Sequence, residues 1–222
     1  MKQQLERRKH QVNDRKKFLM SGLLGDNIVL SGLMVVSPVI ICGDTLKNAA
    51  ALVYAFSLIT FISVLLSSFV PRKLPYAARI IAYSLIAALV YIPVKLSAKE
   101  LYPDSISRIG IYYPLLAVNS LIVFQTEASF FKMKKKDMII SLIFSILGFD
   151  TVMIITGFLR EIFAYGTINN RIVDVNTLID GISKPFGGFI FLGLMCGAYR
   201  CIKNMVTKGK NDVRSAADVS DK

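Results

Sequence analysis

Six long apolar blocks, separated by short polar stretches, constrain the fold of this chain more than any other feature of its sequence. They cover residues 28–42, 46–70, 77–94, 109–124, 138–159 and 185–202. A helix that crosses the roughly 30 Å hydrocarbon core of a bilayer needs about 20 apolar residues. Blocks 46–70 and 138–159 reach that length, and block 77–94 nearly does. The sequence therefore predicts an all-α integral membrane protein with six transmembrane helices.

Two of the blocks, 28–42 and 109–124, are too short for a straight span. At 1.5 Å per residue they reach only about 22–24 Å. Each begins one half of the chain, so the six predicted helices divide into two three-helix repeats, about 22–97 and 105–206. An odd number of spans in each repeat makes the two repeats inverted relative to one another.

Each short block contains a proline at which we expect the helix to break. Pro38 follows Ser37 in the first block, and Pro114 follows Tyr113 in the fourth. Proline has no backbone N–H and clashes with the preceding helical turn. Broken spans at matching positions of two repeats are typical of a site near the membrane midplane. The alternative is that these are ordinary proline kinks in packed helices.

The distribution of basic residues predicts the orientation. Of the 27 Lys and Arg residues, 20 fall on one side of a six-span chain and 7 on the other. Because cytoplasmic loops carry an excess of Lys and Arg, both ends of the chain are expected in the cytoplasm. The net charge of +12 lies between and outside apolar blocks. Its expected partner is therefore the lipid bilayer and its headgroups rather than nucleic acid.

Three regions follow from these patterns. We expect a basic cytoplasmic N-terminal arm over residues 1–21, a six-span membrane domain over 22–206, and a polar cytoplasmic C-terminal tail over 207–222. The composition of the tail predicts disorder.

A few polar residues inside or at the ends of the blocks are candidates for an ion pathway, because charge at membrane depth is costly. Asp150 lies in the middle of the fifth block, where it either binds an ion or proton or makes a structural hydrogen bond to a neighbouring span. The amide of Asn119 can cap unwound backbone or coordinate an ion. Arg160 and Glu161 end the fifth block, and we expect interfacial anchoring there, with a separate partner for each.

Several segments together resemble the membrane subunits of the Rnf and Nqr electron-transport complexes. They are Ser37-Pro38-Val39 with Thr45-Leu46-Lys47-Asn48-Ala49, Gly110-Ile111-Tyr112-Tyr113-Pro114-Leu115 with Val118-Asn119-Ser120, Arg160-Glu161-Ile162-Phe163 with Gly166-Thr167, and Pro185-Phe186-Gly187-Gly188-Phe189-Ile190 with Leu192-Gly193. The resemblance covers roughly residues 22–205. The last two pieces favour the E-type subunit of Rnf or the D-type subunit of Nqr over their sister subunits.

The resemblance also marks a departure from the family. There, cysteines before the first-span proline and after the fourth-span asparagine share a [2Fe–2S] cluster with a sister subunit. Here Ser37 and Ser120 stand at those positions, and a hydroxyl is a poor ligand for such a cluster. Cys42 lies about 140° round a helix from Ser37 and is expected on another face. Cys196 and Cys201 are expected to be packing residues. We therefore expect this chain to bind no cofactor of its own.

What the resemblance implies about function is a membrane subunit that couples electron transfer to Na⁺ or H⁺ movement. Its implied partners are a sister six-span subunit and flavin-bearing membrane subunits, in a prokaryotic plasma (inner) membrane. Glu127 matches an acidic residue of the family and is expected to line an entrance. The sequence shows no self-contained catalytic motif. Two other functions stay open, a stand-alone secondary transporter of a small solute and a structural scaffold.

Overall fold

The structure is a computed structural model that describes Leu30 and residues 36–71, 73–129, 135–168, 171–172 and 180–220. Four helices in this part of the chain are long and apolar enough to cross a membrane. They lie within α3 (Leu46–Ser67), α4 (Tyr76–Leu101), α7 (Lys135–Tyr165) and α8 (Pro185–Ser220). A bent pair of shorter helices forms a fifth candidate span. The fold is thus mostly helical with four to five candidate spans, in agreement with the predicted fold class at that level.

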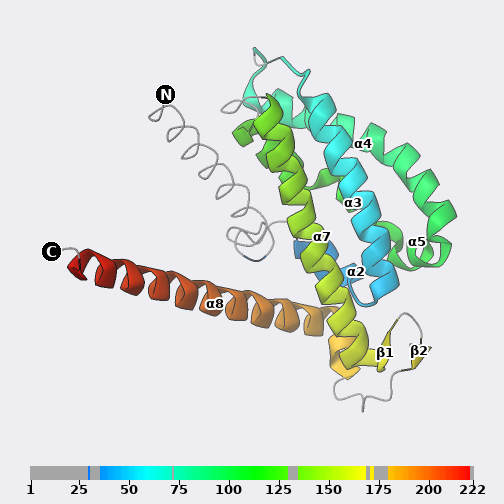
Figure 1. The fold of residues 1–222 in the computed structure, drawn as a ribbon. Coiled ribbons are helices and arrows are strands. Elements are labelled where there is room, and N and C mark those ends of the chain that lie inside the picture. The colour runs from blue at the N-terminus through cyan, green and yellow to red at the C-terminus, as the bar shows by residue number, and fades with distance from the viewer. Residues whose placement is uncertain are drawn as a thin grey trace.

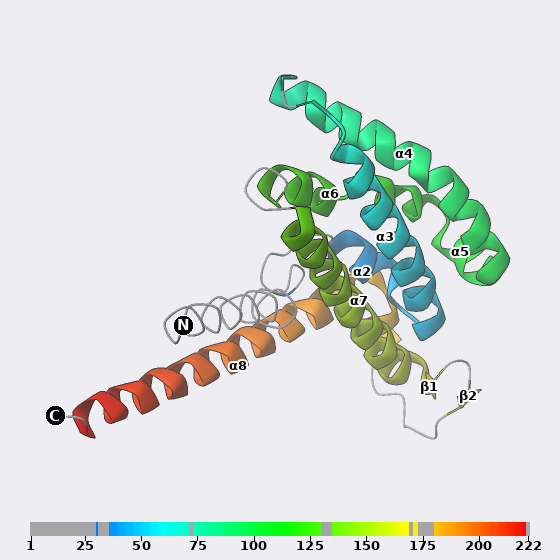
Figure 2. The same ribbon diagram turned by 45° about the horizontal axis from the view of Figure 1, so that its top comes forward.

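Helix α3 lies at the centre of the bundle, between α4 and α7 (Figures 1 and 2). It begins where the Oγ1 atom of Thr45 accepts a hydrogen bond from the backbone N–H of Asn48 at 3.4 Å. Capping by a threonine side chain satisfies one of the free N–H groups at a helix start. Halfway along α3, the ring of Phe56 stacks on Phe149 of α7, with centroids 3.8 Å apart. The buried core of the bundle therefore lies along the interface between α3 and α7.

The fourth block is broken, as predicted. The region that contains this block is made of α5 (Pro103–Ile109), η2 (Gly110–Tyr112), η3 (Pro114–Val118), α6 (Ser120–Phe124) and the π-helix η4 (Gln125–Ser129). The segments before and after Tyr113 are bent by 56°. Gly110 has a φ of 52°, which favours glycine, and Pro114 begins the second segment. The backbone at Asn119 is extended, which separates η3 from α6.

Residues 28, 29 and 31–35 of the first block lie outside the described residues. Its described end is α2 (Val36–Cys42), a helix of seven residues followed by a turn into α3. Pro38 lies in the first turn of α2, where its missing N–H removes no intrahelical hydrogen bond. Pro38 therefore does not interrupt α2. That residues 28–42 form the first of six spans, and a broken one, stays a prediction.

A small hairpin and a short helix connect α7 to α8. Strands β1 (Thr167–Ile168) and β2 (Arg171–Ile172) pair antiparallel. The hairpin is a departure from the predicted all-α fold. It follows Gly166, whose φ of 59° lets the chain turn at the end of α7. The helix η5 (Asp180–Ser183) then leads into α8.

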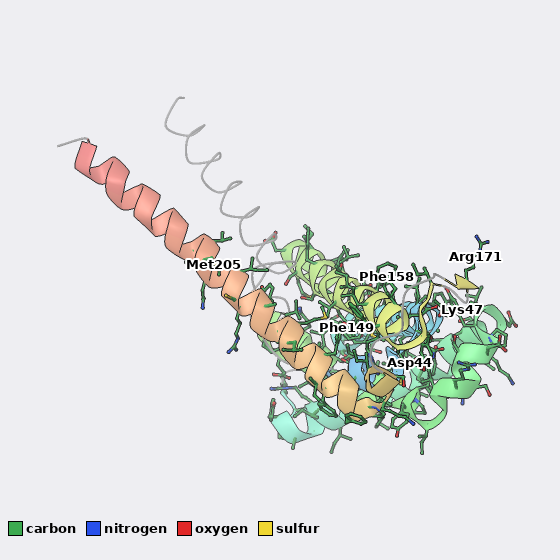
Figure 3. All side chains as sticks on the ribbon, turned by 90° about the horizontal axis from the view of Figure 1, so that it is seen from below. Asp44, Lys47, Phe149, Phe158, Arg171 and Met205 are labelled. Carbon is green, nitrogen blue, oxygen red and sulfur yellow. The ribbon has the colours of Figure 1, made fainter. Side chains whose placement is uncertain are left out.

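Helix α8 runs away from the other helices, so that Met205 lies far from Lys47 and Arg171 at the opposite side of the molecule (Figures 1 and 3). It continues to Ser220. The predicted disorder of residues 207–222 is therefore wrong as far as Ser220, because α8 carries on past the apolar block into the polar tail. The predicted N-terminal arm, residues 1–21, lies outside the described residues.

Candidate functional site

The guanidinium of Arg160, near the end of α7, is fully buried and donates to four backbone carbonyl oxygens. Its Nη1 atom donates to Ile40 at 2.7 Å and to Gly43 at 3.0 Å, at the end of α2. Its Nε and Nη2 atoms donate to Ile182 and Ser183 of η5, both at 3.2 Å. Carbonyls at a helix end lack intrahelical partners, and a cation there satisfies both their hydrogen bonding and their partial charge. This Arg160 clamp joins α2, η5 and α7.

The neighbouring carboxylate of Glu161 holds the start of α3. Its Oε2 atom accepts from the backbone N–H of Leu46 at 2.7 Å, and its Oε1 atom accepts from the hydroxyl of Thr167 at 3.3 Å. The separate partners predicted for Arg160 and Glu161 are confirmed. The predicted interfacial anchoring is wrong, because Arg160 is 0% and Glu161 is 2% exposed. Segments distant in the sequence fold over this end of α7 and bury both charges.

Two glycines at the start of α8 let it approach the clamp. A Cβ atom on Gly188 would lie 2.9 Å from the Ile40 oxygen and 3.1 Å from Nη2 of Arg160. A Cβ atom on Gly187 would collide with the backbone of Gly181. The glycine pair of the Pro-Phe-Gly-Gly segment therefore serves close packing.

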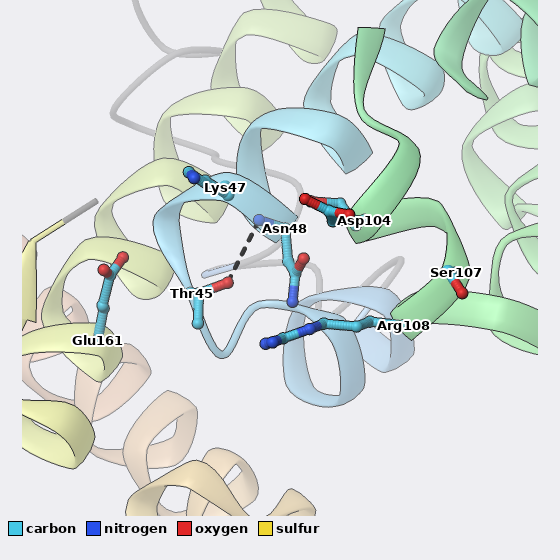
Figure 4. Close-up of a pocket in the computed structure, with 8 residues that line it drawn as sticks. Thr45, Lys47, Asn48, Asp104, Ser107, Arg108 and Glu161 are labelled. Carbon is cyan, nitrogen blue, oxygen red and sulfur yellow. Dashed lines mark hydrogen bonds between the residues drawn. The ribbon is translucent and has the colours of Figure 1, made fainter. Parts of the chain in front are cut away.

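A polar pocket of about 290 Å³ opens beside the start of α3 (Figure 4). Its lining residues are Thr45, Lys47, Asn48, Asp104, Ser105, Ser107, Arg108 and Glu161. Arg108 extends from α5 toward Asn48 (Figure 4). The Nδ2 atom of Asn48 donates to Oδ1 of Asp44 at 2.8 Å. This pocket could not be predicted from the sequence, because its lining residues come from three separate parts of the chain.

The amide of Asn119 holds the break in the fourth block. Its Oδ1 atom accepts from the backbone N–H of Ile122 at 3.0 Å, which caps α6. Its Nδ2 atom donates to the carbonyl oxygen of Leu116 at 2.8 Å and to Oγ1 of Thr60 at 3.3 Å. The predicted capping of unwound backbone is confirmed, and Thr60 links the break to α3.

Asp150 faces α3 from the middle of α7. Its Oδ2 atom accepts a hydrogen bond from Oγ of Ser57 at 2.8 Å. The structural hydrogen bond to a neighbouring span, one of the two predicted roles, is therefore present. The second oxygen, Oδ1, is buried and has no hydrogen-bond partner among the described residues. Since Ser57 and Thr60 are one turn apart, Asp150 and Asn119 contact neighbouring positions of α3.

Glu127 lies in η4 and is paired rather than free. Its two oxygens accept from Nε and Nη2 of Arg79, each at 2.9 Å, and Oε1 also accepts from the hydroxyl of Tyr83 at 2.8 Å. Both Arg79 and Tyr83 belong to α4. The two-point contact fixes η4 on α4. Neither partner could be predicted from the sequence, because both are more than 40 residues away along the chain.

Ser37 and Ser120, at the positions of the family cysteines, are both exposed on this chain. Neither side-chain hydroxyl makes a hydrogen bond within the described part of the molecule. Cys42 is buried, with 4% exposure, so the expectation that it lies on another face than Ser37 is confirmed. Among the described residues, no group of three or more His, Cys, Asp or Glu residues could hold a metal ion. Two hard hydroxyls do not fit the soft thiolate donor set of a [2Fe–2S] cluster.

Several apolar spans, one of them broken, packed around buried polar contacts define a multi-pass helical membrane protein. The family described as "Rnf-Nqr subunit, membrane protein" matches residues 15–206, and the chain belongs to this family. The chain is also similar to proteins named as the E subunit of an "Ion-translocating oxidoreductase complex" in Salmonella paratyphi B, Salmonella heidelberg and Salmonella schwarzengrund. Each is 27% identical over 226 residues, which cover 93% of this chain and 96% of the relative. The predicted family and the resemblance to the E-type subunit are confirmed.

Proposed function

We propose that this chain is a membrane subunit of an Rnf- or Nqr-like complex that couples electron transfer to Na⁺ or H⁺ movement. The observation that carries the proposal is similarity to ion-translocating oxidoreductase subunits over 93% of the chain. The partners are a sister six-span subunit and flavin-bearing membrane subunits. The complex lies in a prokaryotic inner membrane, and both ends of this chain face the cytoplasm, in accord with the distribution of Lys and Arg.

The proposal includes six spans in two inverted repeats. In such a pair of repeats, a contact between spans one and six is matched by one between spans four and three. Helix α2 contacts α8, and η3 contacts α4, in accord with this relation. The second and fifth spans correspond to one another, and their helices α3 and α7 pack together at the centre. Alternating access around a midplane site would be the mechanical element.

The proposal also includes the loss of the intramembrane cluster. Ser37 and Ser120 offer hydroxyls that give up a proton far less readily than a thiol. Their exposed positions beside helix ends suit contacts with the sister subunit. Electrons would then pass through cofactors that the partners carry.

The test is purification of the intact complex from native membranes through a tag on this chain. Flavin-bearing subunits should co-purify, and an electron paramagnetic resonance spectrum of the reduced complex should be unchanged by Ser37→Ala or Ser120→Ala. If the chain purifies in detergent as a monomer without other subunits, the assignment to a complex is wrong. A [2Fe–2S] signal that disappears in either variant would overturn the loss of the cluster.

A second candidate is a stand-alone secondary transporter, which is favoured by the carboxylate of Asp150 at mid-span. Solute uptake into vesicles that contain only this protein would decide for it. A structural scaffold predicts instead that Asp150→Asn and Asn119→Ala leave ion flux unchanged, while assembly of the complex still requires the chain.

A further inference from the structure

The half of α3 that ends at Ser67 carries a row of hydroxyl side chains that could not be recognised from the sequence. Ser57, Thr60, Ser63 and Ser67 follow one another at intervals of three, three and four residues. At 100° per residue these positions share one side of the helix, over about 15 Å. Thr60, Ser63 and Ser67 are at most 1% exposed. The row therefore lies inside the protein and not against lipid.

Three buried oxygen atoms in this region have no hydrogen-bond partner among the described residues. They are Oγ of Ser63, Oγ of Ser67 and Oδ1 of Asp150. Folded proteins satisfy nearly all such atoms with protein groups, ordered water or an ion. Because Asp150 contacts Ser57 at 2.8 Å, its carboxylate stands at one end of the row. Water along the row and a cation at Asp150 would supply the missing partners.

The other end of the row comes to the side of the bundle that is predicted to be cytoplasmic. Ser67 is the last residue of α3, and η4 is one of the elements that contact α3. Another buried polar pair lies there, since Nε2 of Gln125 in η4 donates to Oγ of Ser145 in α7 at 2.5 Å. This end of the α3–α7–η4 region therefore carries several buried polar side chains among its apolar ones.

Beyond Asp150, by contrast, the contact between α3 and α7 is apolar and tightly packed. The rings of Phe56 and Phe149 stack at the level of Asp150. Further along, a Cβ atom on Gly157 would lie only 2.6 Å from the Cβ atom of Ala49. Neither water nor an ion fits between helices that approach this closely. The polar row is thus closed before it reaches the pocket at Glu161.

We propose that the hydroxyl row of α3 is a one-sided entry path for a monovalent cation, which binds at the carboxylate of Asp150 near the membrane midplane. The path opens at the end of the bundle that carries Ser67 and is sealed on the other side by the Phe56–Phe149 and Ala49–Gly157 contacts. The cation is a proton or Na⁺, since both are bound by a carboxylate with hydroxyl neighbours. This inference rests on the proposed ion movement and gives it a site within this chain.

The first experiment measures access to the row in membranes that contain the full complex. With Cys42, Cys196 and Cys201 replaced by serine, single cysteines are introduced by Ser63→Cys, Ser67→Cys and, as the matched control, Ala55→Cys. A small membrane-impermeant thiol reagent should label the first two in inside-out vesicles and not in right-side-out vesicles. Ala55 is fully buried on α3 beyond Ser57 and should stay unlabelled from both sides. Equal labelling at all three positions, or none at Ser63 and Ser67, would overturn the path.

The second experiment tests the binding site in vesicles reconstituted with the purified complex. Electron transfer, Na⁺ uptake and H⁺ uptake are measured together for Asp150→Asn and for the control Thr151→Val. Thr151 is exposed and bonds only to its own helix, at Leu147. Asp150→Asn should lose the flux of one of the two cations while Thr151→Val keeps it, and the lost cation identifies the ligand. If both fluxes persist in Asp150→Asn, the site is wrong.

The two experiments separate the inference from the function on which it rests. The labelling pattern is read in the membrane and does not depend on which partners the chain has. If no flavin-bearing partner exists, the proposed function fails while one-sided labelling of Ser63 and Ser67 still supports the path. If partners are present and the labelling is symmetric, only the path fails.

Discussion

Arg160 and Ile40 lie 120 residues apart in the sequence, yet the Nη1 atom of Arg160 donates to the carbonyl oxygen of Ile40 at 2.7 Å. This contact places the end of the first predicted span against the end of the fifth. It also turns a charge at the end of an apolar block into a buried structural element.

Arg160→Lys should destabilise the protein although the charge is kept. An ammonium group is a point donor and cannot reproduce the planar fork that reaches four carbonyl oxygens. Each buried carbonyl left without a donor costs about 1–3 kcal/mol. Thermal unfolding in detergent, followed by far-ultraviolet circular dichroism, should show a lower midpoint. Arg171→Lys is the control and should leave the midpoint unchanged, because the side chain of Arg171 in β2 is exposed. Equal midpoints for the two variants would show that the clamp contributes nothing.

Gly188→Ala should destabilise the start of α8, whereas Gly193→Ala should not. The new Cβ atom at position 188 would press against the Ile40 oxygen and the Arg160 guanidinium, while nothing lies within 4 Å of one at position 193. Alanine at an unhindered helix position even stabilises, by up to about 1 kcal/mol. The same unfolding measurement compares the two. A similar effect at both positions would contradict the close approach.

Asn119→Ala should loosen the break in the fourth span. The substitution removes the cap of α6 and the link to Thr60, and losing a cap costs about 0.5–2 kcal/mol. Hydrogen exchange followed by mass spectrometry should show faster exchange at the amide of Ile122. Ser120→Ala is the matched control, because Ser120 is exposed and its hydroxyl makes no hydrogen bond within the described part of the chain. Unchanged exchange in Asn119→Ala would mean that the break is held by packing alone.

Glu127 and Arg79 should be energetically coupled. A double-mutant cycle with Glu127→Gln and Arg79→Gln should give a favourable coupling free energy, because the guanidinium of Arg79 donates to both carboxylate oxygens of Glu127. Tyr83→Phe removes only the third hydrogen bond and should have a smaller effect than Glu127→Gln. If the two single variants simply add, the ion pair does not hold η4 on α4.

Most of the helical segments could be predicted from the sequence, because an apolar block of sufficient length has few alternatives. Block 46–70 corresponds to α3 and block 138–159 lies within α7. The ends were less well predicted. Helices α4 and α8 continue beyond their blocks into charged sequence, since a helix that leaves the membrane core needs no apolar side chains. Composition therefore predicts where a membrane-spanning helix lies, but not the residue at which that helix ends.

Contacts within the candidate site were predicted where they are local and missed where they are not. The cap that Asn119 provides involves a neighbour three residues away, and its chemistry is readable from the sequence. The partners of Asp150 and Glu127 are 93 and 44 to 48 residues away. Only the packing of α3 on α7, and of η4 on α4, brings them together. The hydroxyl row on α3 could not be predicted, because single serines are common in apolar helices. Only the burial of these side chains, which the structure gives, distinguishes the row.

The Arg160 clamp and the Asn119 break are held by forces of different strength. A guanidinium with four acceptors makes α2, η5 and the end of α7 into one rigid corner. The 56° bend of the fourth span depends on a neutral amide with three weaker contacts. In the proposed alternating access, the two halves of the molecule move against each other, and the Arg160 clamp is expected to move as a unit. The bend is then expected to act as the hinge, with Thr60 linking it to the helix that carries the hydroxyl row.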